Sequence, residues 1–462
     1  MIVLTLIMVF LLGFSILIII SPKYKISELV GLSYLTGIAA TTTIMFFYDV
    51  FNIKITLFSL FTAIILLAGV ILFYRRNVII RYFRSAGFAK PVLSFKRLNP
   101  SWLLLSFSIF LFITASASKA LYWPPSAYDS LAGYDLMAKV IAAEGKINNS
   151  LFEINNQPIL GTSKRLIYPP LVPGSLGLAY LVGLKSSKII SLLFFLFFIL
   201  IFYSLLRRKS NQTNSLFVLL LMILSPDFLM FSSVTNINIP FAIYTSLAIL
   251  YFYNWITDGN KSDFLISVLM LSSGNWTRSE GVVFFVVILT ILAGKDFVDK
   301  KFKKYHLFIF LGIVPFIIWN LYVKSNFDVA QSVFHGKLFW DKTKFFELIT
   351  YIYRVVFNPK LMGFTIFIFL ALVMMNIRFL IVEKDSSLHL LIIIFSSFFL
   401  YSFLFYQMDN SQMDPLLYMI QNSFKRGLYP FLILIWYYIA INPVTQKIFN
   451  WYESVFFQKV ST

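Results

Sequence analysis

Uncharged apolar runs long enough to cross a membrane recur along almost the whole chain, and no other feature constrains the fold as much. A helical span needs about 20 predominantly apolar residues. The 462-residue chain is 59% hydrophobic and only 13% charged, with a mean hydropathy of +0.81. Soluble globular proteins are about half apolar and about a quarter charged. The sequence therefore predicts an all-α polytopic membrane protein and excludes a soluble globular domain.

The apolar runs predict a bundle of about 11–13 transmembrane helices. Eleven single spans are expected near residues 2–20, 27–48, 55–74, 101–120, 188–206, 214–231, 239–256, 307–323, 361–381, 388–406 and 427–443. A further segment, 264–293, is too long for one span and carries the polar stretch "SGNWTRSEG" in its middle. It predicts a tight helical hairpin, which brings the expected total to thirteen crossings.

The distribution of Lys and Arg predicts the orientation of these spans. Basic residues gather at 75–97, 207–210 and 295–306, and positively charged loops stay on the cytoplasmic side. Met1 then lies outside and Thr462 inside. The formal net charge of +19 is spread between the spans instead of forming a basic soluble domain, which argues against nucleic-acid binding.

Two features limit the chemistry and the processing of the chain. It contains no cysteine, which excludes disulfides, thiolate metal sites and cysteine nucleophiles. The first twenty residues lack a basic start and a small-residue cleavage site, so they predict a retained span and not a signal peptide.

The first long outer loop, 121–187, predicts a helix that lies along the outer membrane surface. Pro124 and Pro125 end the preceding span, and Ser126 can cap a new helix. One apolar stripe then follows, made of Leu131, Tyr134, Ala138 and Ile141.

Asp129 and Asp135 are the candidate carboxylates of this loop. Asp129 falls in the first turn, where the helix dipole also favours an acid, so a purely structural role stays open. Asp135 lies six residues later, about 120° around a regular helix, and cannot share one metal ion with Asp129. We therefore expect one functional aspartate and not a pair.

Three cationic sites could stabilise negative charge near these acids. Arg278 falls at the tip of the predicted hairpin, where an arginine is costly without a partner; the alternative is a structural ion pair with Glu280 or with an acid of an outer loop. Arg426 opens the last span, where ordinary snorkelling is the alternative. Lys164 and Arg165 precede "YPP" and can instead bind lipid headgroups.

Four short motifs resemble signatures of bacterial GT-C glycosyltransferases, in the same order along the chain. "YDSLAGYDLMAK" is similar to the first-outer-loop motif of that family, through Asp129, Tyr134, Leu136, Ala138 and Lys139. "YPPL" at 168–171, "TRSEG" at 277–281 and "RGLYP" at 426–430 resemble further signatures. The family includes protein O-mannosyltransferases and lipid A aminoarabinose transferases.

The resemblance implies an enzyme that takes a sugar from a polyprenyl-phosphate donor at the outer membrane interface. Asp129 would be the catalytic base, and inversion at the anomeric carbon would follow from attack opposite the leaving phosphate. Cations near that phosphate would stabilise its developing charge. The expected donor phosphate-binding residues are Arg278, Arg426, Lys164 and Arg165, and the expected substrate-binding or supporting residues are Asp135, Tyr134, Lys139, Tyr168, Glu280 and Asn238.

One departure from the family pattern concerns a second acid. Many relatives carry an acidic residue before the proline of the second outer loop, where this chain reads "TNINIP", with Asn236 and Asn238. A metal ligand at that point is therefore in doubt. No cofactor is indicated; a divalent metal stays possible, and His306, His335 and His389 do not cluster in sequence.

The outer loops 324–360 and 407–426 are the candidates for acceptor recognition. The loop 324–360 carries the aromatic residues Phe339, Trp340, Phe345, Phe346 and Tyr351. Three roles are open for them: an interfacial belt, faces on which a sugar stacks, or the wall of a lipid groove. In the second loop, Asp409 or Asp414 could pair with Arg426 or Arg278.

The expected organisation has three parts. Residues 1–100 hold three N-terminal spans and a basic cytoplasmic loop, 101–443 form the GT-C-like module, and 444–462 form a short cytoplasmic tail. The expected location is a bacterial inner membrane with undecaprenyl phosphate as carrier, and the acceptor is a glycan, a lipid or a protein. Two other readings stay open: a flippase for lipid-linked sugars, which would usually show internal repeats, and a polysaccharide polymerase or ligase of another fold.

Overall fold

The structure is a computed structural model that describes residues 1–20, 24–85, 99–127, 129–154, 168–300, 302–326, 340–408 and 416–457. Over these residues it consists of helices and their connections, without a strand element. The first helices are α1 (Ile2–Ile20), α2 (Ile26–Val50), α3 (Leu57–Tyr74), α4 (Arg76–Ser85), α5 (Pro100–Tyr122), α6 (Asp135–Glu144), α7 (Ser150–Ile154), α8 (Leu171–Leu181) and α9 (Lys188–Lys209). The middle of the chain forms α10 (Gln212–Ile223), α11 (Pro226–Phe231), α12 (Asn238–Asp258), α13 (Lys261–Asn275), α14 (Gly281–Asp299) and α15 (Val314–Asn326).

The C-terminal third contributes α16 (Lys342–Val356), α17 (Pro359–Met362), α18 (Thr365–Met375), α19 (Ile377–Ile381), α20 (Ser387–Tyr406), α21 (Leu416–Met419), α22 (Lys425–Gly427), α23 (Tyr429–Ile441) and α24 (Pro443–Phe457). Nine of the helices in the described ranges are long and apolar enough to span a membrane, and ten if the bent pair Leu416–Gly427 and Tyr429–Ile441 is one span. The all-α polytopic prediction is confirmed; the total of thirteen crossings stays a prediction.

Residues with side-chain oxygens begin several of these helices. Asn99, Asn211 and Asn260 each accept a hydrogen bond from a backbone N–H in the first turn of α5, α10 and α13. Asp341 accepts from two such groups at the start of α16. Such caps satisfy the N–H groups that a helix start leaves unpaired. The predicted hairpin at 264–293 is present as α13 and α14, joined by the short connection at Trp276–Glu280.

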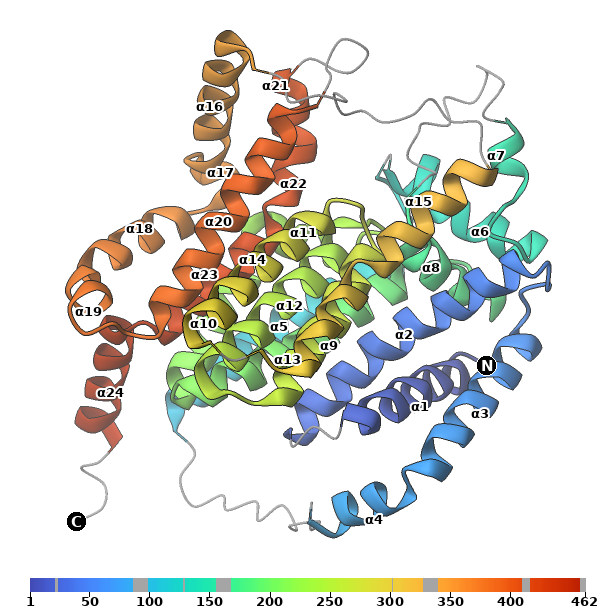
Figure 1. Ribbon diagram of the computed structural model, residues 1–462, viewed down its shortest axis with the longest axis horizontal. Helices are drawn as coiled ribbons and strands as arrows, with labels where there is room; N and C mark the ends of the chain where they lie inside the picture. The colour runs from blue at the N-terminus through green and yellow to red at the C-terminus, as the bar shows by residue number, and fades with distance from the viewer. Residues whose placement is uncertain are drawn as a thin grey trace.

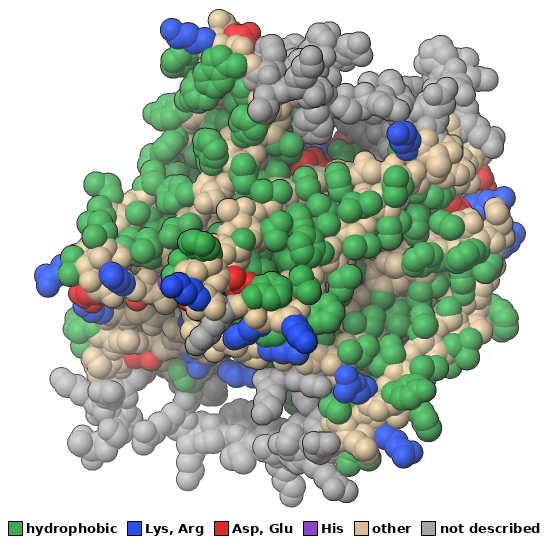
Figure 2. Space-filling view, in the orientation of Figure 1, with side chains coloured by type: hydrophobic (Ala, Val, Ile, Leu, Met, Phe, Trp, Pro, Cys, Tyr) green, Lys and Arg blue, Asp and Glu red, His purple; other side chains and the backbone are tan. Residues whose placement is uncertain are grey.

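Helix α12 forms the centre of the bundle. All of its residues from Asn238 to Trp255 are buried, which is typical of a helix that is apolar on every side. It packs against α9, α13, α14 and α23. In Figure 1, α6, α7 and α16 lie toward the upper edge of the molecule, while α4, α24 and the C-terminus lie toward the lower edge. Figure 2 shows hydrophobic side chains over much of the visible face, as a membrane-embedded surface requires.

A buried charge network ties the N-terminal helices to the rest of the bundle. Arg208 on α9 pairs with Glu28 on α2 and with Asp263 on α13, at 3.0 Å for the second pair. Both carboxylates are about 1% exposed. Part of the basic run at 207–210 is therefore an internal structural contact and not only a topology signal.

Candidate active site

The structure pairs Asp129, near the start of the predicted catalytic module 101–443, with Arg426, near its end. The Arg426 guanidinium donates to the Asp129 carboxylate and forms an ion pair with it. The two side chains are 29% and 17% exposed, so the pair lies at the surface of the helix bundle. Both residues were predicted from the sequence, but their pairing was not. The sequence suggested Asp409 or Asp414 as partners of Arg426, and these two lie outside the described residues.

Each member of this pair is next to a π-helical turn. Asp129 directly precedes the π turn Ser130–Tyr134, and the π turn Ile420–Phe424 ends shortly before Arg426. Such turns are rare and often occur at functional sites. Both widen the helix locally, so the side chains that follow point in directions that a regular helix would not give.

The π turn at Ser130 corrects the predicted apolar stripe. Leu131 is 51% exposed, whereas Tyr134, Ala138 and Ile141 are buried. The stripe therefore begins at Tyr134, because the wider turn rotates Leu131 out of line. The buried face of α6 packs on α8 and not on lipid, and Ala138 lies close to Gly177 of that helix. The expectation that the stripe begins at Leu131 and faces the membrane is therefore wrong, whereas the position of this helix along the outer membrane surface stays a prediction.

Asp135 is anchored inside the protein. It is 1% exposed and accepts hydrogen bonds from the Tyr180 hydroxyl, at 2.6 Å, and from the Ser187 hydroxyl. Lys139 Nζ lies 3.1 Å from its other oxygen. These contacts favour a structural role for Asp135 and Lys139, so their predicted role toward a substrate lacks support from the geometry and stays a prediction.

Lys188 is a buried cation that the sequence analysis missed. Its Nζ donates to the carbonyl oxygens of Lys119 and Trp123, at 2.6 and 2.7 Å, and so caps the end of α5. Its neighbour Ser187 holds Asp135. The start of α9 therefore fixes the chain both before and after Asp129. A lysine beside a span usually indicates only an interfacial anchor, so its sequence position carried no signal.

Arg278 lies deeper than Arg426 and has a complete set of partners. It is 4% exposed and donates to Glu280, at 3.2 Å from Nε, and to the side-chain oxygen of Asn238, at 3.1 Å. Its guanidinium carbon lies 5.2 Å from the centre of the Phe241 ring and 5.9 Å from that of Tyr168. The structural alternative considered for Arg278, an ion pair with Glu280, is therefore present.

Two tyrosines, Tyr168 and Tyr134, lie between Arg278 and the segment that carries Asp129. The Tyr134 and Tyr168 rings are 5.8 Å apart. Burial is the main reason that the pKa of the Tyr134 hydroxyl lies well above its usual value, so this group stays protonated and can donate a hydrogen bond. Lys164 and Arg165, which were expected beside Tyr168, lie outside the described residues.

The second outer loop, between α11 and α12, connects the two arginine sites. Phe231 lies 5.9 Å from the guanidinium carbon of Arg426, and Asn238 accepts from Arg278. Asn236 accepts from the Asn238 backbone N–H at 2.8 Å and so shapes the start of α12. Where many relatives carry an acid in this loop, this chain therefore presents the amide of Asn238 to Arg278. Within the described ranges, no three His, Asp or Glu side chains gather as metal ligands would.

Tyr401 lies against the backbone beside Arg426. It is fully buried, and a Cβ atom placed on Gly427 would lie only 1.6 Å from its hydroxyl oxygen. Only glycine permits this approach. Its hydroxyl has no hydrogen-bond partner among the residues that the structure describes. Tyr401 was not singled out from the sequence, and Gly427 was named only as part of the motif "RGLYP".

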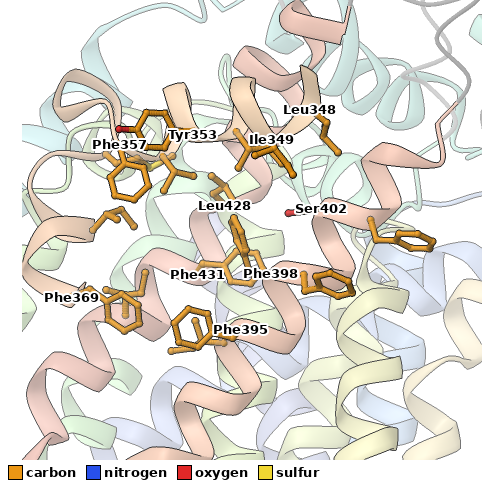
Figure 3. Close-up of a pocket in the computed structure, with 18 of the residues that line it drawn as sticks. Leu348, Ile349, Tyr353, Phe357, Phe369, Phe395, Phe398, Ser402, Leu428 and Phe431 are labelled. Carbon is orange, nitrogen blue, oxygen red and sulfur yellow. The ribbon is translucent and has the colours of Figure 1, made fainter. Parts of the chain in front are cut away.

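An apolar cavity of about 760 Å³ lies between α16, α18, α20 and α23 (Figure 3). Leu428, two residues after Arg426, lines it, and the lining continues along one face of α23 through Phe431, Leu432 and Ile435. Trp340 and Phe345 also line it. Of the three readings of the aromatic residues at 324–360, the wall of a lipid groove therefore fits these two best.

The comparisons with known proteins agree with this architecture. Residues 169–319 match the model of the dolichyl-phosphate-mannose-protein mannosyltransferase family. The matched segment contains Asn238, Arg278 and Glu280 and leaves Asp129 and Arg426 outside. No curated protein and no solved structure gave a significant match. This match covers about a third of the chain, and together with the multi-pass helical fold it supports the resemblance to membrane glycosyltransferases of the GT-C type.

Proposed function

We propose that the protein transfers a sugar from a polyprenyl-phosphate donor to an acceptor hydroxyl at the outer face of the membrane, with inversion at the anomeric carbon and with Asp129 as general base. The observation that carries the proposal is the Asp129–Arg426 ion pair. An apolar cavity begins two residues further along the chain, where Leu428 lines it.

The cavity and the arginine match the two parts of such a donor. A polyprenyl phosphate is a long hydrocarbon that ends in an anion. The cavity is lined almost entirely by apolar side chains, with Ser402 as its one non-aromatic polar residue, so it can take the hydrocarbon without leaving polar groups unpaired. We place the anion near Arg426, which precedes Leu428 of the cavity lining by two residues.

Arg426 is a better phosphate contact than Arg278. Arg426 is 29% exposed on its side chain and pairs with a partly exposed acid. Arg278 is almost fully buried and already bonds Glu280 and Asn238. Breaking a buried pair leaves an uncompensated charge and costs about 3–5 kcal/mol, whereas an exposed pair contributes only about 0.2–1 kcal/mol. We infer that Arg278 positions the loop and that Arg426 meets the donor.

The ion pair suggests an order of events. A donor phosphate that binds Arg426 replaces the Asp129 carboxylate there and frees it. The free carboxylate takes the proton of the acceptor hydroxyl while that oxygen bonds to the anomeric carbon. The bond between this carbon and the phosphate oxygen breaks, and the phosphate leaves with its electron pair, stabilised by Arg426. Attack opposite the leaving group inverts the anomeric centre.

The proposed location follows from charge and resemblance. The basic segments 75–97, 207–210 and 295–306 are expected on the cytoplasmic side, which puts Asp129 and Arg426 on the outer side. A bacterial inner membrane, with undecaprenyl phosphate as carrier, is the setting that the resemblance implies. Residues 101–443 would be the catalytic module.

The test is transfer of radiolabelled sugar by the purified chain in liposomes, from polyprenyl-phosphate sugars to an acceptor pool of membrane glycans and lipids. Wild type is compared with Asp129→Asn and with Asp258→Asn, a partly exposed acid in an ion pair with Lys209 at the other end of α12 from Asn238. Loss of transfer in the first variant only is the expected result. Equal loss in both would contradict a specific role of Asp129.

The flippase reading has its own signature in the same vesicles. A flippase would move a fluorescent lipid-linked sugar between leaflets without forming a new glycosidic bond. Movement without transfer or hydrolysis, for every donor tried, would overturn the proposal.

A further inference from the structure

A second groove, which shares no lining residue with the donor cavity, lies between the N-terminal helices and the bundle. It has a volume of about 370 Å³ and is bounded by α1, α2, α3, α13 and α15. Its floor is made of small side chains such as Thr36 and Ala40 on α2. Phe47 and Leu67, on its rim, are 44% and 48% exposed, so the groove opens to the surroundings of the protein.

The groove exists because α3 packs loosely. Only Leu60, Ile64 and Ala68 of this helix are buried, and its contacts are mainly with α1. Figure 1 shows α3 at the outer edge of the N-terminal helices, followed by α4. Within a membrane this space cannot stay empty, because its lining would lose dispersion contacts.

The lining of the groove suits a lipid chain. Most of its residues are aliphatic or aromatic, and hydroxyl groups come only from Thr36, Thr43, Ser272 and Ser273. A lipid hydrocarbon chain, which surrounds the helices of a membrane protein, can enter such a groove.

A positive charge lies at one end of the groove. Leu67 and Ile71 line it, and Arg75 follows one turn later on the same face of α3. The Arg75 guanidinium lies 3.5 Å from the carbonyl oxygen of Ile19, at the end of α1. This position is between the ends of two helices that bound the groove. The exposed Arg76 is adjacent.

The two arginines retain donors for a ligand. No carboxylate in the described part of the chain forms an ion pair with either. A guanidinium has five N–H donors, and the single contact to Ile19 leaves most of those of Arg75 available. An anion next to an apolar groove is the chemistry of an acidic phospholipid.

We propose that this groove is a binding site for one anionic phospholipid of the leaflet that meets the basic loops, with an acyl chain in the groove and the headgroup on Arg75 and Arg76. The lipid would fill the space between α3 and the bundle. This site is separate from the donor cavity, and it does not depend on the proposed glycosyl transfer.

The test is native mass spectrometry of the full chain titrated with phosphatidylglycerol or with phosphatidylcholine of the same acyl chains. Wild type should retain phosphatidylglycerol more strongly. The double variant Arg75→Gln/Arg76→Gln should lose roughly 30-fold in its affinity, at about fivefold for each arginine near a lipid headgroup. Arg378→Gln, an exposed arginine remote from the groove, is the matched charge control and should bind as wild type does.

A second pair of variants tests the groove itself. Ala40→Phe fills the floor and should also weaken phosphatidylglycerol binding, whereas Ala371→Phe, at an exposed alanine of α18, should not. Equal retention of the two lipids by wild type would overturn the proposal without any variant. So would unchanged binding in Ala40→Phe, or an equal loss in Arg378→Gln.

Discussion

Replacing Asp129 by Asn should weaken turnover and strengthen donor binding at the same time. In the free protein, the carboxylate of Asp129 competes with the donor phosphate for Arg426. The two side chains are partly exposed, so their pair is worth no more than about 1 kcal/mol. Removing the competitor should therefore tighten the binding of a polyprenyl phosphate by up to about fivefold, at 1.36 kcal/mol for each factor of ten.

Turnover should move in the opposite direction. A positioned general base typically contributes about 10²- to 10⁴-fold to a rate, so transfer by Asp129→Asn should fall by that factor. The assay combines radiolabel transfer with equilibrium binding of unlabelled polyprenyl phosphate, the product, which binds without reacting.

Two controls make the reasoning refutable. Asp258 and Lys209 form another partly exposed ion pair, remote from the site, and Asp258→Asn should change neither quantity. In the Arg426→Gln background, Asp129→Asn should no longer tighten binding, because the pair is already gone. Weaker binding of polyprenyl phosphate by Asp129→Asn, or turnover equal to wild type, would refute the proposed exchange.

Three further predictions concern residues around the site. Lys188→Met leaves the carbonyl oxygens of Lys119 and Trp123 without their donor; we expect a loss of about 1–3 kcal/mol in unfolding free energy, measured by denaturant titration in detergent. Gly427→Ala should destabilise by about 1–3 kcal/mol through overpacking against Tyr401, and Tyr401→Leu in the same chain should restore thermal stability if the clash is the cause. Ser402→Trp should fill part of the donor cavity and raise KM for long polyprenyl donors at least tenfold, while a donor of one or two isoprene units keeps its KM; equal effects on both donors would contradict the assignment of the cavity.

The sequence alone determined the fold class and the approximate positions of the spans. Hydrophobic length is a local property, because each span must satisfy its own backbone hydrogen bonds within the membrane. For the same reason the hairpin at 264–293 and the helix caps at Asn99, Asn211 and Asn260 follow from short stretches of residues. The motifs of Asp129, Arg278 and Arg426 were recognised through their resemblance to GT-C signatures, and the roles of these residues stay predictions.

Only the tertiary structure decided which of these residues meet. Asp129 and Arg426 are separated by 297 positions, and no local rule relates them. Packing likewise decided that Arg278 bonds Glu280 and Asn238, and that Lys188 holds the end of α5. The apolar cavity depends on how α16, α18, α20 and α23 pack against one another. Apolar side chains pack without specific pairing. Composition therefore predicted that these helices would be buried, but it could not predict the cavity that they leave between them.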